Sequence, residues 1–190
     1  MEILSRKPAT KRPEIVRAAT MLFAKHGVDG TSMRDVADAA GVREAAIYRY
    51  FESKEQMSRE IFTSWYGWYT GRLREIVRGV GSTHEKVAAM ARMELSVAAE
   101  HTEPFIYFCE NGGRFLKSLS AEVPRAHELL IELVKEGQKC GEVKPGDAAL
   151  LADMLGGALC TVATAIVRRH LKGAIDLELI AGSCWALIAA

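Results

Sequence analysis

The sequence predicts an all-α fold for its 190 residues. Apolar residues recur along most of the chain at the three- and four-residue spacing of helices that are buried on one side. Runs of β-branched residues bounded by turn residues, which are typical of strands, are scarce. The five prolines lie near expected helix starts or in connections. With 49% hydrophobic and 26% charged residues, the composition is that of a globular protein whose core needs no disulfides.

The first two helices carry start and stop signals. The first is expected to begin near Pro13, because proline suits the first turn of a helix, and to end at Gly27. The second is expected to begin after Thr31 or Ser32, because Ser32 and Asp35 have the three-residue spacing of a capping box. These local signals fix both helix starts to within a few residues.

Two further helices follow a tight turn. Gly41 is expected to end the second helix as a left-handed cap, and the third helix is predicted over residues 44–51. Ser53 and Gln56 form another capping pair, which starts a fourth helix that extends to about residue 80.

The rest of the chain is also predicted to be helical. Residues 1–54, including a basic arm over residues 1–11, are expected to form a small N-terminal domain, and residues 55–190 a larger helical domain. The sequence Asn111-Gly112-Gly113 is expected to break one of the later helices. These later helices are predicted near residues 84–101, 103–119, 124–140, 147–170 and 176–189.

The second and third helices, joined by the turn at Gly41, have the layout of a helix-turn-helix, whose second helix fits the DNA major groove. Ile47 and Phe51 occupy the inner face of this helix, so Tyr48 and Tyr50 cannot both be core residues. Their hydroxyl groups suit contacts with phosphates.

The start of the second helix also suits a phosphate. Thr31, Ser32 and Arg34 lie at its first turn, where main-chain N–H groups and a hydroxyl group can hold an anion. Residues 1–60 carry 11 Lys and Arg against 9 Asp and Glu, in a chain of formal net charge +1. This mild basic excess is compatible with DNA binding, since the local placement of basic side chains matters more than the total.

Residues spread over positions 12–60 agree in register with one known family. They are Leu22-Phe23, His26-Gly27, Thr31-Ser32-Met33-Arg34-Asp35-Val36-Ala37, Ala40-Gly41-Val42, Ile47-Tyr48-Arg49-Tyr50-Phe51 and Ser53-Lys54. In these residues the sequence resembles the TetR family of transcriptional repressors. The resemblance implies phosphate contacts by Tyr48, Tyr50 and Lys54, and base contacts by the start of the third helix. It also implies a double-stranded DNA operator, a small-molecule effector of unknown identity and a homodimer.

The sequence departs from the common family pattern at the start of the third helix. Arg43 replaces the usual Ser or Thr, so this helix lacks a side-chain N-cap, and Ala45 replaces a Gly or small polar residue. Arg43 either reads a guanine edge or holds a phosphate, whereas Glu44 either accepts from a cytosine amino group or pairs with Arg43. The candidate DNA-binding residues are Thr31, Ser32, Arg34, Arg43, Glu44, Ala45, Tyr48, Arg49, Tyr50 and Lys54.

Aromatic and methionine side chains gather in the C-terminal domain. They are expected either to form its core or to line an apolar ligand cavity, which the family resemblance implies. Polar groups such as Glu110, Asn111, Arg114 or His127 would then fix the orientation of the ligand. The candidate ligand-binding residues are Trp65, Trp68, Tyr69, Met90, Met93, Phe105, Phe108, Asn111, Phe115 and His127.

The last two predicted helices favour association between two chains. Small residues repeat every four positions after Ala148, which lets another helix approach closely, and the segment from Leu177 to Ile188 is apolar on nearly every side. The alternative is a monomer with these helices in its core; the resemblance implies a dimer formed through them. The candidate interface residues are Ala152, Gly156, Gly157, Cys160, Thr164, Ile180, Cys184 and Leu187.

No enzymatic site, metal site or cofactor is expected. The five histidines are scattered, and none of the usual metal or nucleophile motifs is present. The four cysteines are widely spaced, as is typical of reduced and mostly buried thiols. The apolar run from Ala148 to Val167 contains Asp153, and the N-terminus lacks the apolar segment of a signal peptide, so no membrane location is expected.

These observations predict a cytoplasmic protein that associates with the nucleoid when bound to DNA. Its expected function is that of a ligand-responsive homodimeric repressor, which a small-molecule inducer releases from a pseudo-palindromic operator. The alternative is a helical protein–protein adaptor that has lost DNA binding, an interpretation favoured only by Glu44 and the modest local charge.

Overall fold

The computed structural model describes residues 10–168 and 176–190, and within these residues it contains helices and no β-strand. The predicted all-α fold class is confirmed. The predicted basic arm over residues 1–11 and the last residues of the helix predicted over 147–170 lie wholly or partly outside the described residues.

The chain divides into two compact units, unit 1 (Met1–Phe62) and unit 2 (Thr63–Ala190). The division falls inside a long helix, whereas the sequence placed the domain boundary at residue 54, where that helix starts. The first residues of this helix belong to unit 1, and two of them, Met57 and Phe62, are fully buried.

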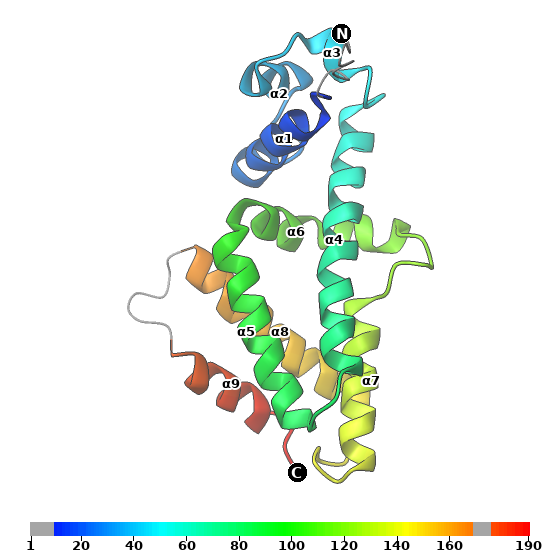
Figure 1. Ribbon diagram of the computed structural model, residues 1–190, viewed down its shortest axis with the longest axis vertical. Coiled ribbons are helices and arrows are strands. Elements are labelled where there is room, and N and C mark those ends of the chain that lie inside the picture. Colours follow the sequence, from blue (N-terminus) through cyan, green and yellow to red (C-terminus); the bar gives the residue numbers. More distant parts are fainter. Residues whose placement is uncertain (1–9, 169–175) are drawn as a thin grey trace, which may run out of the picture. The chain divides into compact units, whose positions relative to one another are not determined.

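Unit 1 contains α1 (Arg12–His26), α2 (Met33–Ala40), α3 (Glu44–Ile47) and the start of α4 (Lys54–Arg78). In Figure 1 the first three helices run from blue to cyan. Helix α2 packs against both α1 and α3. The apolar residues that hold these helices together, all fully or almost fully buried, are Ile15, Ala19, Phe23, Val36, Ala37, Ile47 and Phe51.

The third helix is shorter than predicted. It was expected over residues 44–51, but the α-helical hydrogen-bonding pattern ends at Ile47, and Tyr48, Arg49 and Tyr50 form a turn. The Tyr50 N–H donates to the Ile47 carbonyl, three residues back, at 2.8 Å. A bond over three residues winds the chain more tightly than the four-residue bond of an α-helix. The side chains of Ile47 and Phe51 still both point into the core, as the spacing predicted.

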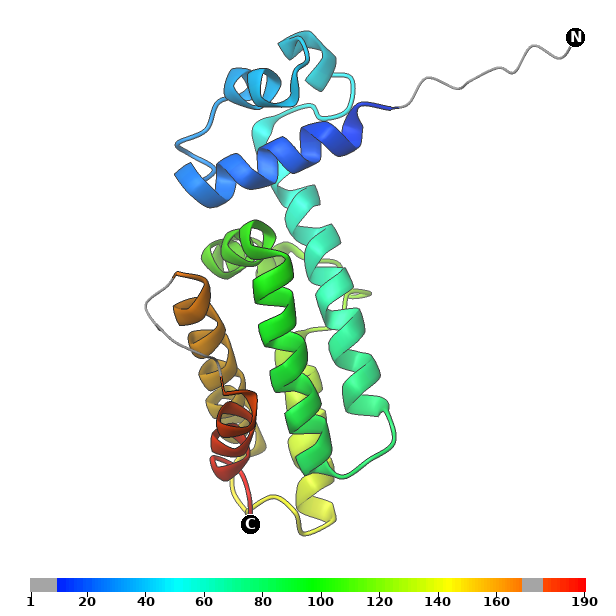
Figure 2. The ribbon, with the colours of Figure 1, turned by 60° about the vertical axis from the view of Figure 1, so that its left-hand side comes forward.

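Within the described residues, unit 2 contains the rest of α4 and five further α-helices. These are α5 (Thr83–Glu100), α6 (Thr102–Phe115), α7 (Ala126–Lys139), α8 (Ala148–Val167) and α9 (Leu177–Ala186), with a short 3₁₀ helix, η1 (Leu116–Ser118), after α6. Helix α5 packs against α6, α7, α8 and α9, and it lies among them in Figures 1 and 2. The central position of α5 explains why most of its residues from Val87 to Ala98 are buried.

The predicted break at Asn111-Gly112-Gly113 is wrong, since α6 continues through these residues. The Asn111 side chain donates from Nδ2 to the Tyr107 carbonyl at 2.8 Å, one helical turn back. This bond satisfies the buried amide group within the helix itself, so the residue does not need to leave the helical path.

The end of the chain is tied to the connection between α7 and α8. Val143 and Ala189 form an isolated antiparallel bridge, and the N–H of Ala190 donates to the Glu142 carbonyl at 3.1 Å. Glu142 in turn accepts a hydrogen bond from the N–H of Thr83 at the start of α5. These bonds hold α9 beside α5.

Helix α8 is long and apolar enough to cross a membrane, as judged by length and composition alone. Core helices of soluble proteins meet the same criterion, and Leu151, Leu155 and Leu159 of α8 belong to the hydrophobic core of unit 2.

Candidate functional site

The turn between α2 and α3 is set by Gly41. Its φ of 64° and ψ of 37° place it in the left-handed region, where glycine avoids the steric cost of a side chain. The N–H groups of Gly41 and Val42 donate to carbonyls of the last turn of α2, with Val42 reaching Ala37 at 3.0 Å. The predicted left-handed cap is thereby confirmed, and it directs the chain into α3.

The predicted capping box at the start of α2 is also confirmed. The Ser32 hydroxyl accepts from the Asp35 N–H at 3.1 Å, and the Asp35 carboxylate accepts from the Ser32 N–H at 2.8 Å. The Ser32 hydroxyl also donates to the Asp35 carboxylate, and these bonds lower the pKa of that carboxyl group. The Ser32 hydroxyl is therefore already engaged within the protein.

Thr31 is a structural residue in the described protein. Its side chain is only 3% exposed, and its hydroxyl donates to the Gly27 carbonyl at 2.9 Å. The Lys54 ammonium donates to the Thr31 carbonyl at 2.7 Å, so it joins the start of α4 to the residues before α2. The burial of Thr31 argues against the phosphate contact by its hydroxyl that the sequence suggested.

The remaining candidate DNA-binding residues lie at the surface of unit 1. Arg34, Arg43, Glu44, Ala45, Tyr48 and Arg49 are exposed, Tyr50 and Lys54 are half-buried, and Tyr48 is 51% exposed despite its aromatic ring. Within the described residues, no hydrogen bond or ion pair engages the side chains of Arg43, Tyr48 or Arg49. As expected, Arg43 precedes α3 without a side-chain cap. Glu44 forms no ion pair with Arg43 among the described residues.

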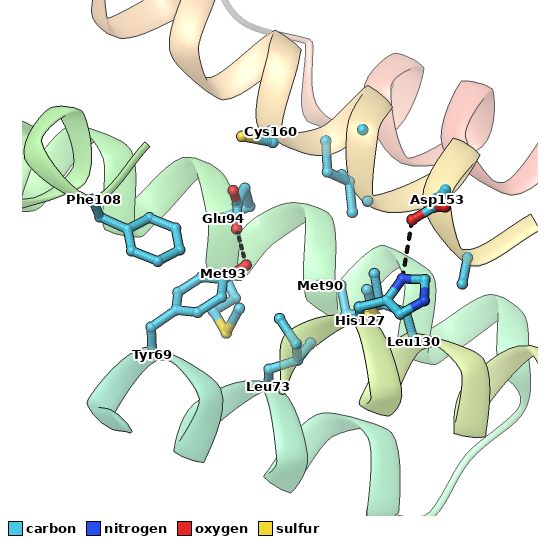
Figure 3. Close-up of a pocket in the computed structure, with 15 residues that line it drawn as sticks. Tyr69, Leu73, Met90, Met93, Glu94, Phe108, His127, Leu130, Asp153 and Cys160 are labelled. Carbon is cyan, nitrogen blue, oxygen red and sulfur yellow. Dashed lines mark hydrogen bonds and ion pairs between the residues drawn. The ribbon is translucent and has the colours of Figure 1, made fainter. Parts of the chain in front are cut away.

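Unit 2 contains a partly open cavity of about 240 Å³ that is lined by residues of α4, α5, α6, α7 and α8. Leu73, Met90, Met93, Leu130 and Leu159 make most of its wall apolar. Figure 3 shows Tyr69, Phe108, Glu94 and Cys160 grouped on one side of this cavity, and His127 with Asp153 on the other. An apolar wall with few polar groups is the usual character of a small-molecule site.

Glu94 is the buried acidic residue of the cavity wall. Its side chain lies on α5 and is 5% exposed, and the Tyr69 hydroxyl donates to its Oε2 at 2.7 Å (Figure 3). Burial raises the pKa of the Glu94 carboxyl to about 7, although the hydrogen bond from Tyr69 opposes this shift. Burial and the neighbouring carboxylate also raise the pKa of Tyr69 well above its usual value. Near neutral pH the cavity therefore holds a carboxyl group that can be either protonated or ionised.

The second polar pair lies on the opposite side. Nδ1 of His127 on α7 is 3.0 Å from Oδ1 of Asp153 on α8, and both side chains are largely exposed to solvent. Because these groups remain hydrated, their mutual attraction contributes little to stability.

The predicted ligand-binding residues fall into two groups. Tyr69, Met90, Met93, Phe108 and His127 line the cavity. The others do not line it. Phe105 and Phe115 are core residues, and the amide of Asn111 bonds to its own helix. Trp65 packs on the rings of Tyr69 and Phe108, and Trp68 is 39% exposed beside His101.

Several predicted interface residues also have another role. Ala152, Gly156, Gly157 and Cys160 line the cavity, and Ala152 is completely buried inside unit 2. Cys184 is 3% exposed and packs in the same core. Ala152 and Cys184 are thus core residues and not interface residues, because α5 covers the inner faces of α8 and α9. Thr164, Ile180 and Leu187 are half-buried.

The outer faces of α8 and α9 expose apolar side chains. Leu150 and Met154 on α8 are 60% and 40% exposed, and Leu179 on α9 is 65% exposed. Gly157, which also lines the cavity, and Thr161 continue the same exposed face of α8, while Gly182, Ser183 and Ala186 are exposed on α9. Sequence reasoning did not separate this outer face from the inner face of the two helices, which packs against α5. The outer face consists of Leu150, Met154, Gly157, Thr161, Leu179, Gly182, Ser183 and Ala186.

Sequence reasoning also missed Glu94, Leu73 and Leu130 as cavity residues. A signal for Glu94 was present, because it lies four residues after Met90 and three before Val97, in a run of otherwise apolar buried positions of α5. A single acidic residue at such a position must face either a polar partner or a cavity.

The four cysteines are free thiols, and only Cys184 is buried, whereas Cys140 is exposed. The Sγ atoms of Cys109 and Cys160 are 3.9 Å apart, between α6 and α8. Either thiol can donate in this contact, which raises the pKa of the Cys109 thiol and lowers that of Cys160. Within the described ranges, no three His, Cys, Asp or Glu side chains are grouped as a metal site would require.

Comparison with known proteins points to one family for unit 1. Residues 15–61 match the family model described as "Bacterial regulatory proteins, tetR family". The matched residues contain α2, the turn at Gly41, α3 and the start of α4, which are the elements that carry the exposed Arg43, Tyr48 and Arg49.

Curated relatives extend the similarity beyond unit 1. The HTH-type transcriptional repressor KstR2 of Mycolicibacterium smegmatis is 27% identical over 145 residues, which cover 73% of this chain and 70% of the relative. The fatty acid metabolism regulator protein of Bacillus subtilis is 26% identical over 186 residues, which cover 94% of this chain and 95% of the relative.

Solved structures share the fold over most of the chain. The transcriptional regulator FadR from Bacillus subtilis, solved in complex with stearoyl-CoA, superimposes with a TM-score of 0.72 at 24% identity and covers 93% of this chain and 96% of its own. A transcription regulator from Marinobacter aquaeolei superimposes with a TM-score of 0.77 at 22% identity, over 95% of this chain and 96% of its own.

Proposed function

We infer that this chain, which belongs to the TetR family of transcriptional regulators, represses transcription as a homodimer on a DNA operator and leaves the operator when a small molecule fills its cavity. The observation that carries this proposal is the exposed set Arg43, Tyr48 and Arg49, whose side chains have no hydrogen-bond or ion-pair partner among the described residues, next to the buried Ile47.

The proposed DNA contacts divide into two kinds. Tyr48, Tyr50 and Lys54 would contact phosphates, since hydroxyl and ammonium groups suit phosphate oxygens and carry no sequence information there. Arg43, at the start of α3, would read a base edge, because a guanidinium group can donate two parallel hydrogen bonds to guanine. Thr31 is excluded from these contacts by its burial, and its carbonyl positions Lys54 instead.

The outer face of α8 and α9 is proposed to bind a second copy of the chain. Burial of its exposed leucine and methionine side chains would contribute most of the favourable free energy of association, and its small residues permit close helix packing. A two-fold dimer would present two copies of α3 to two related half-sites, which predicts a pseudo-palindromic operator.

The cavity in unit 2 is proposed as the effector site. Its mostly apolar wall and the stearoyl-CoA bound by the B. subtilis structure both favour an effector with a hydrocarbon body. Helix α4 carries Lys54 at its start and Tyr69 and Leu73 at the cavity, so a shift of α4 on ligand binding would reach the DNA-binding residues. A cytoplasmic location follows from this function.

The alternative function, a helical protein–protein adaptor, is separated from the repressor by a mobility-shift assay. The purified full chain is incubated with fragmented DNA from its source genome at low salt. Retardation of discrete fragments is expected, and sequencing them identifies the operator. Absence of retardation at low salt would favour the adaptor, because non-specific DNA binding is strongest under that condition.

A further inference from the structure

We propose that the cavity in unit 2 binds a lipophilic amine, a ligand with a protonated nitrogen on a hydrocarbon body, and that Glu94 selects this nitrogen. The inference relies on the proposed function only in taking this cavity as the effector site. The family match in unit 1 does not indicate which ligand the cavity holds.

Glu94 is a buried acid in the wall of the cavity. Its carboxyl group is nine-tenths or more removed from solvent, yet it lines a cavity and has a single hydrogen-bond donor, the Tyr69 hydroxyl, within the described residues. A carboxylate has capacity for several donors, so one of its oxygens remains available to a ligand. A buried acid in an apolar wall costs free energy unless it is paired, and a ligand cation supplies that pairing.

Aromatic rings lie beside Glu94 in the cavity wall. The rings of Tyr69 and Phe108, which both line the cavity, have their centroids 5.6 Å apart at an interplanar angle of 34°. Aromatic faces attract cations through their quadrupole, so these rings add to the attraction of the carboxylate for a protonated amine. Trp65 stacks on Tyr69 at 6.0 Å and keeps that ring in place.

The charged and titratable groups around the cavity also favour a cationic ligand. Tyr69 and Cys160 are the titratable groups nearest to Glu94, and Cys109 contacts Cys160. His127 and Asp153 pair with each other on the opposite side of the cavity. The described lining contains no lysine or arginine that would hold an anionic head group. A carboxylate ligand would meet the ionised Glu94 as a like charge, and an alcohol could donate a hydrogen bond to it but would bring no opposite charge.

The proposal predicts a definite pH dependence. With a pKa of about 7, Glu94 is mainly protonated at pH 6 and mainly ionised at pH 8, whereas an alkylamine, like a lysine side chain, stays protonated at both. The amine should therefore bind about tenfold more weakly at pH 6 than at pH 8. At pH 6 its binding should also release about one proton per ligand.

Isothermal titration calorimetry with three probes of equal chain length tests the proposal: octylamine, octanol and octanoate, each titrated into the full chain without DNA. Octylamine is expected to bind at least about tenfold more tightly than the others at pH 8, since of the three probes only the ammonium adds an opposite charge to its hydrogen bond with the Glu94 carboxylate. Equal or tighter binding of octanol or octanoate, or no binding of any probe, would overturn the proposal.

Two variants locate the effect. Glu94→Gln keeps the side-chain shape and an acceptor for Tyr69, and it should abolish both the preference for octylamine and its pH dependence. Glu100→Gln, an exposed residue of the same helix that bonds to Ser96, should change neither. Retention of the amine preference by Glu94→Gln would overturn the role of Glu94. If that variant does not fold, the proton release and pH dependence of the unmodified chain decide the question.

The outcome is independent of DNA binding. A chain that retards operator fragments but does not prefer octylamine retains the proposed function and loses this inference. A chain that prefers octylamine but retards no DNA retains the inference and loses the proposed function.

Discussion

The Lys54 ammonium donates a hydrogen bond to the Thr31 carbonyl at 2.7 Å, and this bond joins the first residue of α4 to the residues that precede α2. It places a positive charge beside the start of the helix-turn-helix. Lys54 has two further N–H donors, which remain available to a phosphate.

Lys54→Ala is therefore expected to weaken DNA binding and folding together. Affinity should fall by a similar factor for every DNA sequence, and the log–log salt slope should decrease in magnitude by about 0.9, the value for one lost phosphate contact. The free energy of unfolding should fall by about 1 kcal/mol because a hydrogen bond is lost. Fluorescence anisotropy and urea denaturation measure the two effects.

Two further variants act as controls for Lys54→Ala. Tyr48→Phe should weaken DNA binding without loss of stability, because its hydroxyl is exposed and has no partner among the described residues. Lys139→Ala removes an exposed charge from unit 2 and should leave the salt slope unchanged. An altered sequence preference in Lys54→Ala would contradict the phosphate assignment.

Arg43→Ala is expected to change which DNA sequence is preferred. Arg43 is exposed at the start of α3 and makes no side-chain cap, so its removal costs the fold little. Selection of DNA from a random pool should show relaxed preference at one base pair in each half-site, with a loss there of about 1–3 kcal/mol of discrimination. Uniform weakening on all sequences would assign Arg43 to a phosphate instead.

The sequence predicted the first helices well because their signals are local. Ser32 with Asp35 and the left-handed Gly41 act within one helical turn, so tertiary packing has little power to overrule them. The length of α3 was less predictable, because the four-residue spacing of Ile47 and Phe51 suits both a full helix and the observed helix followed by a turn.

The cavity and the dimer face could not be separated from the sequence. A stripe of small residues indicates that something approaches closely, but its spacing does not say whether that is the same chain or another. Gly156 shows this ambiguity, because a side chain added there would meet Leu130 of its own chain at 2.8 Å. Glu94 was overlooked for a related reason, since its importance comes from Tyr69 on a different helix.

The outer face of α8 and α9 is expected to hold the dimer together. Leu179→Glu and Met154→Glu place a charge on side chains that are 65% and 40% exposed in the single chain, so folding should be preserved while association is lost. Sedimentation or light scattering should give the mass of two chains for the unmodified protein and of one for these variants.

Val80→Glu is the matched control for this dimer prediction. Val80 is fully exposed and lies in unit 2 outside α8 and α9, so a charge there should leave the dimer intact. A monomeric unmodified protein, or dimers that persist in both interface variants, would contradict the proposed interface.

Glu94 is expected to make stability depend on pH. Its pKa is raised from 4.5 to about 7 in the folded protein, so its contribution to stability is complete below pH 4.5 and is lost as the pH rises through 7. Glu94→Gln removes this titration. The unfolding free energy of the variant minus that of the unmodified protein should therefore rise by about 2–3 kcal/mol from pH 5 to pH 8. Equal differences at both pH values in urea denaturation would show that Glu94 ionises normally.

The central claim is that the exposed residues of α3 make this chain a sequence-specific DNA-binding protein. A salt titration of its DNA affinity tests this claim most directly. The full chain is titrated by anisotropy against an operator fragment recovered from the genome and against a scrambled fragment of equal length and composition. The account predicts a slope of about −0.9 per phosphate contacted on both, with the operator bound more tightly at every salt concentration. Equal affinity for the two fragments, or an affinity that does not change with salt, would contradict it.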